Sequence, residues 1–291
     1  MKRKNFSPHT VRNYLHRLQQ FLIWITVPVE LVSSEEVKSY IDFMLDKQLA
    51  AQTINGHLIV IRRFYHYLRQ EEGVVLDNPA VKGMALRLSK PLPRHVRDDD
   101  VSTFFESVTK PRDVAMFMLM LRCGLRVEEV ANLSLDAIDY RRSQIMVRSG
   151  KGAKDRVVYI SNDAGNALAA YLRKRDQTKE QKIFLVEKGL CKGKPISVRG
   201  IQKRIEYYSR KSGISVSCHQ LRHTMATQLL NADADLVTIQ ELLGHTRIKT
   251  TMRYCKLANV KAERDYFKAV SVIMEKGCFD TTGAGCNDPP R

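Results

Sequence analysis

A basic segment that contains two prolines divides the chain into parts with different sequence patterns. Residues 85–97 read ALRLSKPLPRHVR. Pro91 and Pro93 disfavour a helix there, and the basic side chains favour contact with water. The 291 residues of the chain also fit two domains of ordinary size better than one. We therefore expect residues 91–97 to be a linker between two domains.

The first domain, residues 1–90, is predicted to be helical, because its apolar side chains recur at the three- and four-residue spacing of a helix. Ser33 and Glu36 form a capping box, which marks the start of one helix. The aromatic residues on these helix faces are more typical of a core than of a ligand surface. The predicted helices begin at Ser7-Pro8, at Ser33, near Gln52 and after Asn78-Pro79.

The second domain, residues 98–275, is predicted to combine helices with a β-hairpin. Asp98, Asp99 and Asp100 suit the first turn of a helix because of the helix dipole. Two alternating stretches, 144–148 and 156–160, flank the turn-rich SGKGAKD, which is the pattern of a hairpin. Further helices are predicted at 114–121, 127–133, 162–175, 197–212, 219–231, 235–243 and 261–275. The expected fold is mainly α with a small β-sheet or hairpin, and residues 276–291 are expected to be a loose tail.

Basic residues outnumber acidic ones in both parts of the chain. The sequence holds 48 Lys and Arg against 31 Asp and Glu, a net charge of +17, of which +5 falls in residues 1–90 and +12 in residues 91–291. This charge favours a polyanionic partner but does not separate a DNA binder, an RNA binder and an enzyme. No apolar run approaches the roughly 18–20 residues of a membrane span. Six widely spaced cysteines without a CxxC pair favour a reducing cytoplasm over a disulfide framework.

The motif CHQLRHTMATQLL places His219 and Arg222 three residues apart at the start of a helix. Both side chains then project from nearly one face, and the free N–H groups and dipole of a helix N-terminus favour anions. The pattern fits a phosphate site. Taken alone, it also fits a basic helix end that is simply solvated.

Two earlier motifs add a second arginine and a lysine. CGLRVEEV places Arg126 at a helix N-terminus, where the dipole disfavours a cation, so Arg126 is expected to face an anion or a carboxylate. Glu129, three residues later, is placed to orient it. SGKGAKD places Lys151 between two glycines in the hairpin turn, and a lysine near other cations can protonate an alkoxide leaving group. A surface arginine and a solvated hairpin tip are the alternatives.

The last motif, LLGHTRIKTTMRYCKL, contains a candidate nucleophile. Gly244 can end a helix, His245 follows at once, and Tyr254 comes nine residues after the histidine. A tyrosine in a helix is usually a core or surface residue. One close to two histidines and two arginines can do more, because its phenol, with a pKa of about 10, can attack a phosphodiester when cations stabilise the developing charge.

In chain order, these residues resemble the signature of the tyrosine recombinase (phage integrase) family. GLRVEEV, GKGAKDR, HQLRHTMAT and LLGHTRIKTTMRY look like its four boxes, over roughly residues 98–262. SPHTVRNYLHRLQQFLIWI and INGHLIVIRRFYHYL resemble its helical core-binding domain. The resemblance implies a two-domain fold that closes around duplex DNA, with a SAM-like helical domain before a mixed α/β catalytic domain. The architecture is similar to that of simple Xer-like or transposon-type recombinases.

The resemblance also implies a reaction. Tyr254 would attack the scissile phosphate and form a 3′-phosphotyrosyl link, while Lys151 would protonate the leaving 5′-oxygen and His219 would help to deprotonate the tyrosine. The phosphotyrosine conserves the bond, so another strand's 5′-hydroxyl can reseal it without ATP. No cofactor and no metal ion are expected.

The remaining motif residues would surround the phosphate. By resemblance, Arg126 and Arg222 would hold its non-bridging oxygens, and His245 would hydrogen-bond it. Glu129 would orient Arg126. The candidate DNA contacts outside this set are Lys154, Arg156, Arg62 and Arg63.

The partners implied are double-stranded DNA with inverted-repeat core sites and three further copies of the chain. The resemblance implies a homo-tetramer on two DNA sites that exchanges strands through a Holliday junction, with residues 261–275 packed on the neighbouring protomer. A related recombinase or an accessory protein is a further partner that this architecture allows. The protein is expected in the cytoplasm, at the nucleoid, and not at a membrane.

Three other functions fit part of the pattern. A noncatalytic DNA-binding regulator needs the charge but not the ordered catalytic residues. A metal-dependent phosphodiesterase would use His219, His223 and His245, since the first two are four residues apart, but no carboxylate lies at the expected place in that helix. A topoisomerase-like relaxing activity shares the first half of the cleavage chemistry.

Overall fold

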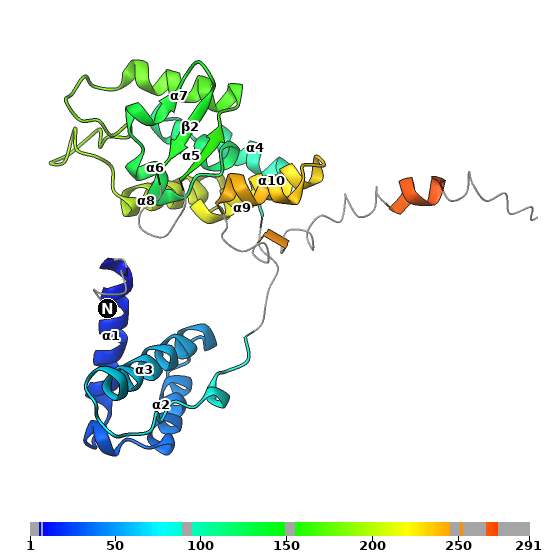
Figure 1. Cartoon of the computed structure of the whole chain (residues 1–291). Helices are drawn as coiled ribbons and strands as arrows, with labels where there is room; N and C mark the ends of the chain where they lie inside the picture. Colours follow the sequence, from blue (N-terminus) through cyan, green and yellow to red (C-terminus); the bar gives the residue numbers. More distant parts are fainter. Residues whose placement is uncertain are drawn as a thin grey trace, which may run out of the picture. The chain divides into compact units, whose positions relative to one another are not determined.

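The computed structural model describes residue 6 and residues 8–88, 95–148, 155–244, 251–252 and 266–272. The chain forms two compact units, Met1–Pro91 and Leu92–Arg291, whose elements are labelled in Figure 1. The described parts are mostly helical and include one small antiparallel sheet, which confirms the predicted fold class. Among the described residues, no helix combines the length and the apolar character that a membrane span requires.

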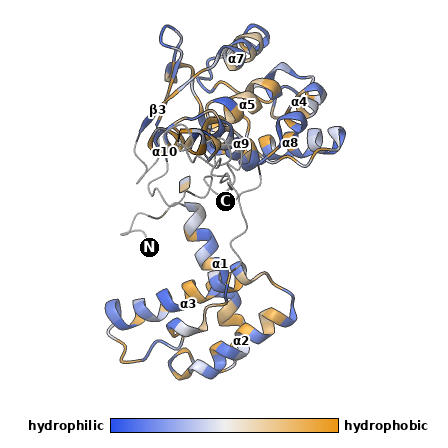
Figure 2. Cartoon of the chain, turned by 90° about the vertical axis from the view of Figure 1, so that its right-hand side faces the viewer, coloured by the Kyte–Doolittle hydropathy of each residue, from blue (hydrophilic) through white to orange (hydrophobic). Residues whose placement is uncertain are grey.

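Three helices build the first unit: α1 (Pro8–Trp24), α2 (Ser34–Asp46) and α3 (Ala51–Glu71). The predicted capping box at α2 is confirmed, because the Glu36 carboxylate accepts a hydrogen bond from the Ser33 backbone N–H at 2.8 Å. The apolar residues form stripes along the helices, as Figure 2 shows. These stripes pack into one core around Phe21, Tyr40, Leu58 and Tyr65.

The segment after Pro79 differs from the predicted short helix, since it forms only one 3₁₀ turn, Lys82–Met84. Side chains of α3 take up the backbone groups that a helix would pair internally. Arg62 donates to the carbonyl oxygens of Ala80 and Val81 at 2.8 and 2.9 Å. The chain is therefore held along α3 by side chains and not by helical hydrogen bonds.

The second unit contains seven labelled helices and a three-stranded sheet in its described parts. The helices are α4 (Asp98–Ser107), α5 (Pro111–Arg122), α6 (Val127–Asn132), α7 (Asn162–Lys174), α8 (Val198–Ser212), α9 (Cys218–Asn231) and α10 (Leu236–Leu243). The strands β1 (Ile138–Asp139), β2 (Gln144–Val147) and β3 (Arg156–Tyr159) pair antiparallel in chain order. The predicted hairpin strands are confirmed, with Ile145 opposite Val158. The hairpin tip, residues 149–154, lies outside the described residues.

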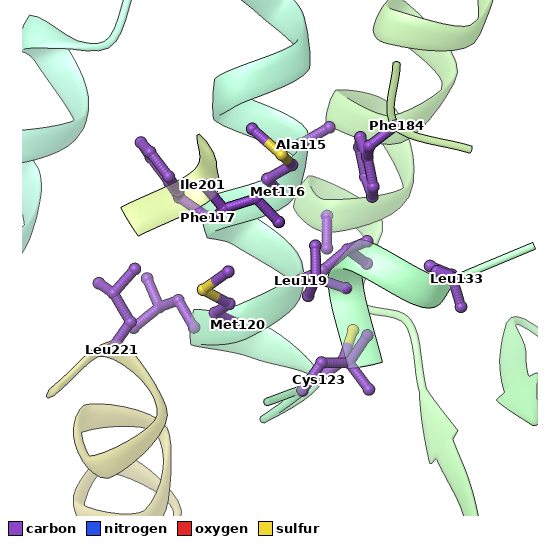
Figure 3. Packing of buried hydrophobic residues seen from close by; sticks show 14 of the residues in the cluster. Ala115, Met116, Phe117, Leu119, Met120, Cys123, Leu133, Phe184, Ile201 and Leu221 are labelled. Atoms are coloured by element: carbon purple, nitrogen blue, oxygen red, sulfur yellow. The ribbon is translucent and has the colours of Figure 1, made fainter. Parts of the chain in front are cut away.

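Helix α5 is the centre of the second unit. Its side chains are buried on several faces, including Met116, Phe117 and Met120, each with no exposed area. Figure 3 shows side chains of neighbouring elements around it, among them Ile201 of α8 and Leu221 of α9. Because α5 is apolar nearly all round, it must be enclosed by other elements. At its C-terminal end, Arg122 binds Asp163 of α7 and Gln228 of α9, and α6 follows after a short turn. The candidate site is built around this end.

The helix predicted at residues 261–275 is described only in part, with residues 266–272 helical. The other predicted helices of this unit begin and end within three residues of the observed ones. The predicted tail, residues 276–291, lies outside the described residues.

Candidate active site

The turn between α5 and α6 sets the position of Arg126. Gly124 has a φ of +63°, and a Cβ at this residue would lie 2.9 Å from the Met225 sulfur. Only glycine fits both conditions without a shift of the neighbouring side chain. The turn leaves Arg126 as the N-cap residue of α6, where Glu129 accepts from its backbone N–H at 2.7 Å and from Nη1 at 2.9 Å.

Arg222 comes from the second turn of α9, which Ser217 caps by accepting from the backbone N–H of Gln220. Its side chain is buried, with 2% of the residue exposed. The guanidinium donates through Nη1 to the Gly124 carbonyl oxygen and through Nη2 to the Leu243 carbonyl oxygen. These bonds to two backbone carbonyl oxygens orient the guanidinium.

The C-terminal end of α10 brings the two arginines together. The Leu243 carbonyl oxygen, which holds Arg222, also accepts from Nη2 of Arg126 at 3.2 Å, as does the Gly244 oxygen at 3.2 Å. Gly244 ends α10 with a φ of +58°, as its sequence position predicts. The last carbonyl oxygens of a helix carry partial negative charge. They offset the repulsion between two guanidinium groups that share one acceptor.

A hollow of about 500 Å³ opens beside these groups. It is lined by Arg126, His219 and Arg222, together with Glu128 of α6 and with Arg199 and Glu206 of α8. The His219 ring lies 4.1 Å from that of His223, centre to centre, so the two stack edge to face. The structure thus brings three predicted site residues from two helices to one concave surface. Two cations and a histidine around such a hollow suit a phosphate group.

Glu129 holds the arginines on the inner side of the site. Burial alone would raise the pKa of this carboxyl, but hydrogen bonds from Arg156 and Arg126, together with their charges, lower its pKa to about 2. Nη1 and Nη2 of Arg156 donate to the two carboxylate oxygens at 2.8 and 2.7 Å. Glu129 is therefore a carboxylate at any pH near neutrality, and it neutralises one of the two arginines beside it.

Arg156, a predicted DNA contact, lies inside the unit. Its side chain is only 7% exposed and its guanidinium is turned toward Glu129. The motif GKGAKDR gave no sign of this carboxylate partner, which lies 27 residues earlier in the chain. One signal was available: alternation along β3 puts Arg156 on the same face as the buried Val158.

The two candidate DNA contacts in the first unit have different surroundings. Arg62 is half-buried, and its bonds to the Ala80 and Val81 carbonyl oxygens fix the segment after α3. Arg63 is exposed and lies over the rings of Phe6 and Tyr14, at 5.2 and 5.3 Å from their centres. Arg62 thus has a structural use, whereas Arg63 remains a candidate DNA contact.

Four of the predicted site residues, Lys151, Lys154, His245 and Tyr254, lie outside the described residues. Within the described ranges, no group of three His, Cys, Asp or Glu side chains is arranged to hold a metal ion.

Family models match most of the chain. A model described as the phage integrase family matches residues 95–260, and one described as the phage integrase N-terminal SAM-like domain matches residues 1–72. Two relatives are tyrosine recombinase XerA of Thermococcus kodakarensis and tyrosine recombinase XerC of Thermodesulfovibrio yellowstonii. The first is 31% identical over 92% of each chain, and the second is 34% identical over 86% of each.

Solved structures share the fold. A crystal structure of XerA recombinase is 26% identical to the chain, with a TM-score of 0.56, and covers 92% of this chain and 95% of its own. The Tn1549 transposon integrase in complex with a circular intermediate DNA has a TM-score of 0.73 at 18% identity, over 87% of this chain and 91% of its own. XerH site-specific recombinase bound to palindromic difH has a TM-score of 0.72 at 17% identity, over 90% and 80%.

Proposed function

The chain belongs to the phage integrase family of tyrosine site-specific recombinases, and on this premise we propose that it cuts and rejoins DNA strands through Tyr254. The observation that carries the proposal is the paired guanidinium groups of Arg126 and Arg222. They share the Leu243 carbonyl oxygen at the hollow that His219 also lines.

The reaction begins with a phosphodiester in the hollow. The Tyr254 oxygen attacks phosphorus, the bond from phosphorus to the 5′-oxygen breaks, and the DNA is left joined to the tyrosine through its 3′-phosphate. His219 accepts the phenol proton, and Lys151 gives a proton to the departing 5′-oxygen. The reverse reaction with the 5′-hydroxyl of another strand rejoins the DNA, and two rounds of exchange pass through a Holliday junction.

Arg126 and Arg222 supply the electrostatic part of this mechanism. Charge accumulates on the non-bridging oxygens as the tyrosine attacks, and fixed cationic donors stabilise that charge without reorganising at the moment of reaction. Removing one such donor costs about 10²- to 10³-fold in rate in well-studied enzymes. In the proposed mechanism these cations stabilise the charge that metal ions stabilise in many nucleases. The reaction therefore requires no metal ion and no ATP.

The chain positions of the remaining residues support this assignment. His245 directly follows Gly244, whose carbonyl oxygen binds Arg126 at 3.2 Å. Lys151 lies five residues before Arg156, which binds the Leu242 carbonyl oxygen at 2.8 Å. His245 and Lys151 thus lie one and five positions along the chain from Gly244 and Arg156, and we propose that both complete the site around the paired arginines.

The partner that follows is double-stranded DNA. We infer that the protein binds inverted-repeat core sites and recombines two of them as a homo-tetramer. Three solved structures have the fold of this chain: Tn1549 integrase in complex with a circular intermediate DNA, lambda integrase bound to a COC′ core site, and XerH bound to palindromic difH. A net charge of +17 supports binding to a polyanion.

A covalent adduct tests the proposal. The DNA that flanks the gene is first searched for inverted repeats. The substrate is a nicked duplex that carries such a repeat, and the reaction contains EDTA. Wild-type protein should form a DNA adduct that survives a denaturing gel. Tyr254→Phe should bind the same duplex and form none, whereas Tyr159→Phe, which changes a tyrosine that is 60% exposed on β3, should behave as wild type. An adduct with Tyr254→Phe, or a requirement for added metal ion, would contradict the mechanism.

A further inference from the structure

Arg156 lies at the start of β3 and uses three nitrogens on partners inside the protein. Nη1 and Nη2 form a two-bond pair with the oxygens of Glu129 at 2.8 and 2.7 Å, and Nε donates to the Leu242 carbonyl oxygen at 2.8 Å. A guanidinium with this two-bond geometry fixes both the position and the plane of its partner carboxylate. Arg156 thus connects the β2–β3 hairpin to α6 and to the end of α10.

Each oxygen of Glu129 is shared between two arginines. Oε1 accepts from Arg156 and from Nη1 of Arg126, and Oε2 accepts from Arg156 and from the backbone N–H of Arg126. Glu129 is one of the groups that hold Arg126 in place, and Arg156 fixes the position of the Glu129 carboxylate. If Arg156 were absent, the Glu129 carboxylate could turn about its last bond and carry Arg126 with it.

The other anchor is the end of α10, which also depends on Arg156. The carbonyl oxygen of Leu242 accepts from Arg156, that of Leu243 from Arg126 and Arg222, and that of Gly244 from Arg126. A Cβ on Gly244 would lie 3.0 Å from Cδ of Arg156, so the guanidinium stem passes close to this helix end. Three arginines thus bind three successive carbonyl groups.

We propose that Arg156 is a positioning residue for DNA cleavage: it does not contact DNA, but holds Glu129 and the end of α10 so that Arg126 and Arg222 face the phosphate as a fixed pair. This inference rests on the proposed function. Stability alone does not explain the arrangement, because a buried ion pair is often no more stabilising than an apolar replacement. The arrangement places the guanidinium groups of Arg126, Arg156 and Arg222 at the end of α10. Arg126 and Arg222 line the hollow, whereas Arg156 does not.

The test compares Arg156→Gln and Arg156→Lys with wild type. Lysine keeps the charge but cannot make the two-bond pair with Glu129. The matched control is Arg148→Gln, because Arg148 also adjoins the hairpin and pairs with Asp136 at 3.0 Å, but is 66% exposed. Circular dichroism shows that each variant is folded. Two quantities are then measured on the nicked duplex: the affinity over a series of salt concentrations, and the rate of adduct formation at saturating protein.

Both Arg156 variants should bind DNA with an affinity within about twofold of wild type and with the same salt slope. Their cleavage rates should fall by about ten- to a hundredfold, the range expected when a reacting group is displaced by about 1 Å. Arg148→Gln should cleave at the wild-type rate. A phosphate contact at Arg156 would give a different result: weaker binding, a salt slope lower by about 1 and little change in the cleavage rate. That result would overturn the inference.

A double-variant cycle separates positioning from general loosening of the fold. If Arg156 acts through Glu129, the variant that combines Arg156→Gln with Glu129→Gln should cleave about as slowly as the slower single variant. Multiplication of the two single effects would overturn the route through Glu129. If wild type forms no adduct on a duplex that it binds, the proposed function fails and the inference fails with it. If wild type forms the adduct and Arg156→Gln matches its rate, the inference alone fails.

Discussion

Arg222 has unusual surroundings for a buried cation. It is 2% exposed, and the two oxygens that orient it are backbone carbonyl groups of Gly124 and Leu243. Arg222 and Arg126 line the same hollow. We propose that the two guanidinium groups bind a DNA phosphate there.

The first prediction concerns this residue. Arg222→Ala should reduce adduct formation by about 10²-fold or more, because a transition-state donor is lost, while DNA affinity should change by less than about threefold. Affinity comes mainly from many phosphate contacts, of which this is one. Gel-shift titrations and single-turnover cleavage on one duplex measure both quantities. Losses of affinity and cleavage in proportion would show that the arginine serves ordinary binding.

A second titratable residue lies in the core of the first unit. His57 of α3 is 4% exposed, and its Nδ1 lies 3.1 Å from the Tyr40 hydroxyl. Burial, with smaller contributions from the charges of Arg17 and His16, lowers the pKa of His57 from 6.5 to about 4. The fold therefore contains neutral His57, whereas the unfolded chain protonates this residue below pH 6.5.

The second prediction is a loss of stability in acid. The contribution of neutral His57 is complete above pH 6.5 and is lost as the pH falls toward 4, by about 1–3 kcal/mol. The only tryptophan, Trp24, packs on Tyr40 at 5.0 Å between ring centres, so its fluorescence reports the unfolding of this unit. Urea titrations from pH 7 to pH 4 measure the change.

Two variants identify the residue responsible. His57→Gln should flatten the pH dependence of the free energy of unfolding, because glutamine does not titrate. His66→Gln changes an exposed histidine of the same helix and should leave the pH dependence as in wild type. An unchanged slope in His57→Gln would assign the acid sensitivity to other groups.

At the scale of elements, two helices end at a glycine in the left-handed conformation, but the two glycines have different neighbours. α8 ends at Gly213 with a φ of +73°, and α10 ends at Gly244 with a φ of +58°. A Cβ would meet nothing within 4 Å at Gly213, whereas at Gly244 it would approach Arg156 to 3.0 Å. An alanine substitution at Gly213 therefore measures the free-energy cost of the left-handed conformation alone. The same substitution at Gly244 adds the cost of displacing Arg156.

The third prediction follows from this comparison. Gly213→Ala should cost about 1–2 kcal/mol of stability, through backbone strain alone, and leave the rate of adduct formation unchanged. Gly244→Ala should cost at least as much and also slow cleavage by about tenfold or more, since Arg156 and the α10 carbonyl groups must shift. Thermal unfolding and single-turnover cleavage measure the two effects. Equal cleavage rates in the two variants would contradict this account of the end of α10.

Elements that depend on nearby residues could be predicted from the sequence. The capping box at Ser33, the hairpin strands and the breaks at Gly124 and Gly244 each depend on a few neighbouring residues, and each is confirmed. The helix predicted after Pro79 was wrong, because Arg62 of α3 binds the backbone of that segment, which forms only a 3₁₀ turn. Predictions from neighbouring residues in the sequence do not account for such tertiary contacts.

The candidate site divides in the same way. Motif spacing placed Arg126, Glu129, His219 and Arg222 in one set, and the structure brings these four side chains to one region. It gave no indication that α10 carbonyl groups hold both arginines, because backbone acceptors leave no mark in a sequence. The burial of Arg156 could not be predicted for a related reason. An exposed and a buried arginine in a basic turn look alike until the partner carboxylate is placed.

At the scale of the whole molecule, the net charge of +17 divides into two uses. Arg126 and Arg222 line the hollow, and Arg156 is turned inward to Glu129. We propose that most of the surplus basic residues contact the DNA backbone. Charges of this second kind should set the affinity and its salt dependence, because each phosphate contact releases a counter-ion.

The fourth prediction tests this second use. Lys154→Gln should weaken binding to all duplexes alike and lower the slope of log affinity against log salt by about 1, while the cleavage rate at saturating protein stays near that of wild type. Arg156→Gln, two residues away in the sequence, should show the opposite pattern. Fluorescence anisotropy from low to moderate salt measures the slopes. If both variants changed the salt slope and the cleavage rate in the same way, Lys154 and Arg156 could not be separated into a DNA-backbone contact and a positioning residue.

The last prediction concerns assembly. In the proposed tetramer, protomers meet on two DNA sites. Residues 266–272 are helical, and Tyr266 and Phe267 are 63% and 59% exposed. Large exposed aromatic side chains suit a surface that another protomer covers. A truncated chain that lacks residues 262–291 should bind a single site with wild-type affinity and fail to pair two sites, so strand exchange between two duplexes should disappear. Sedimentation of protein–DNA complexes measures pairing, and a two-duplex exchange assay measures recombination. Wild-type recombination by the truncated chain would show that protomers meet through other surfaces.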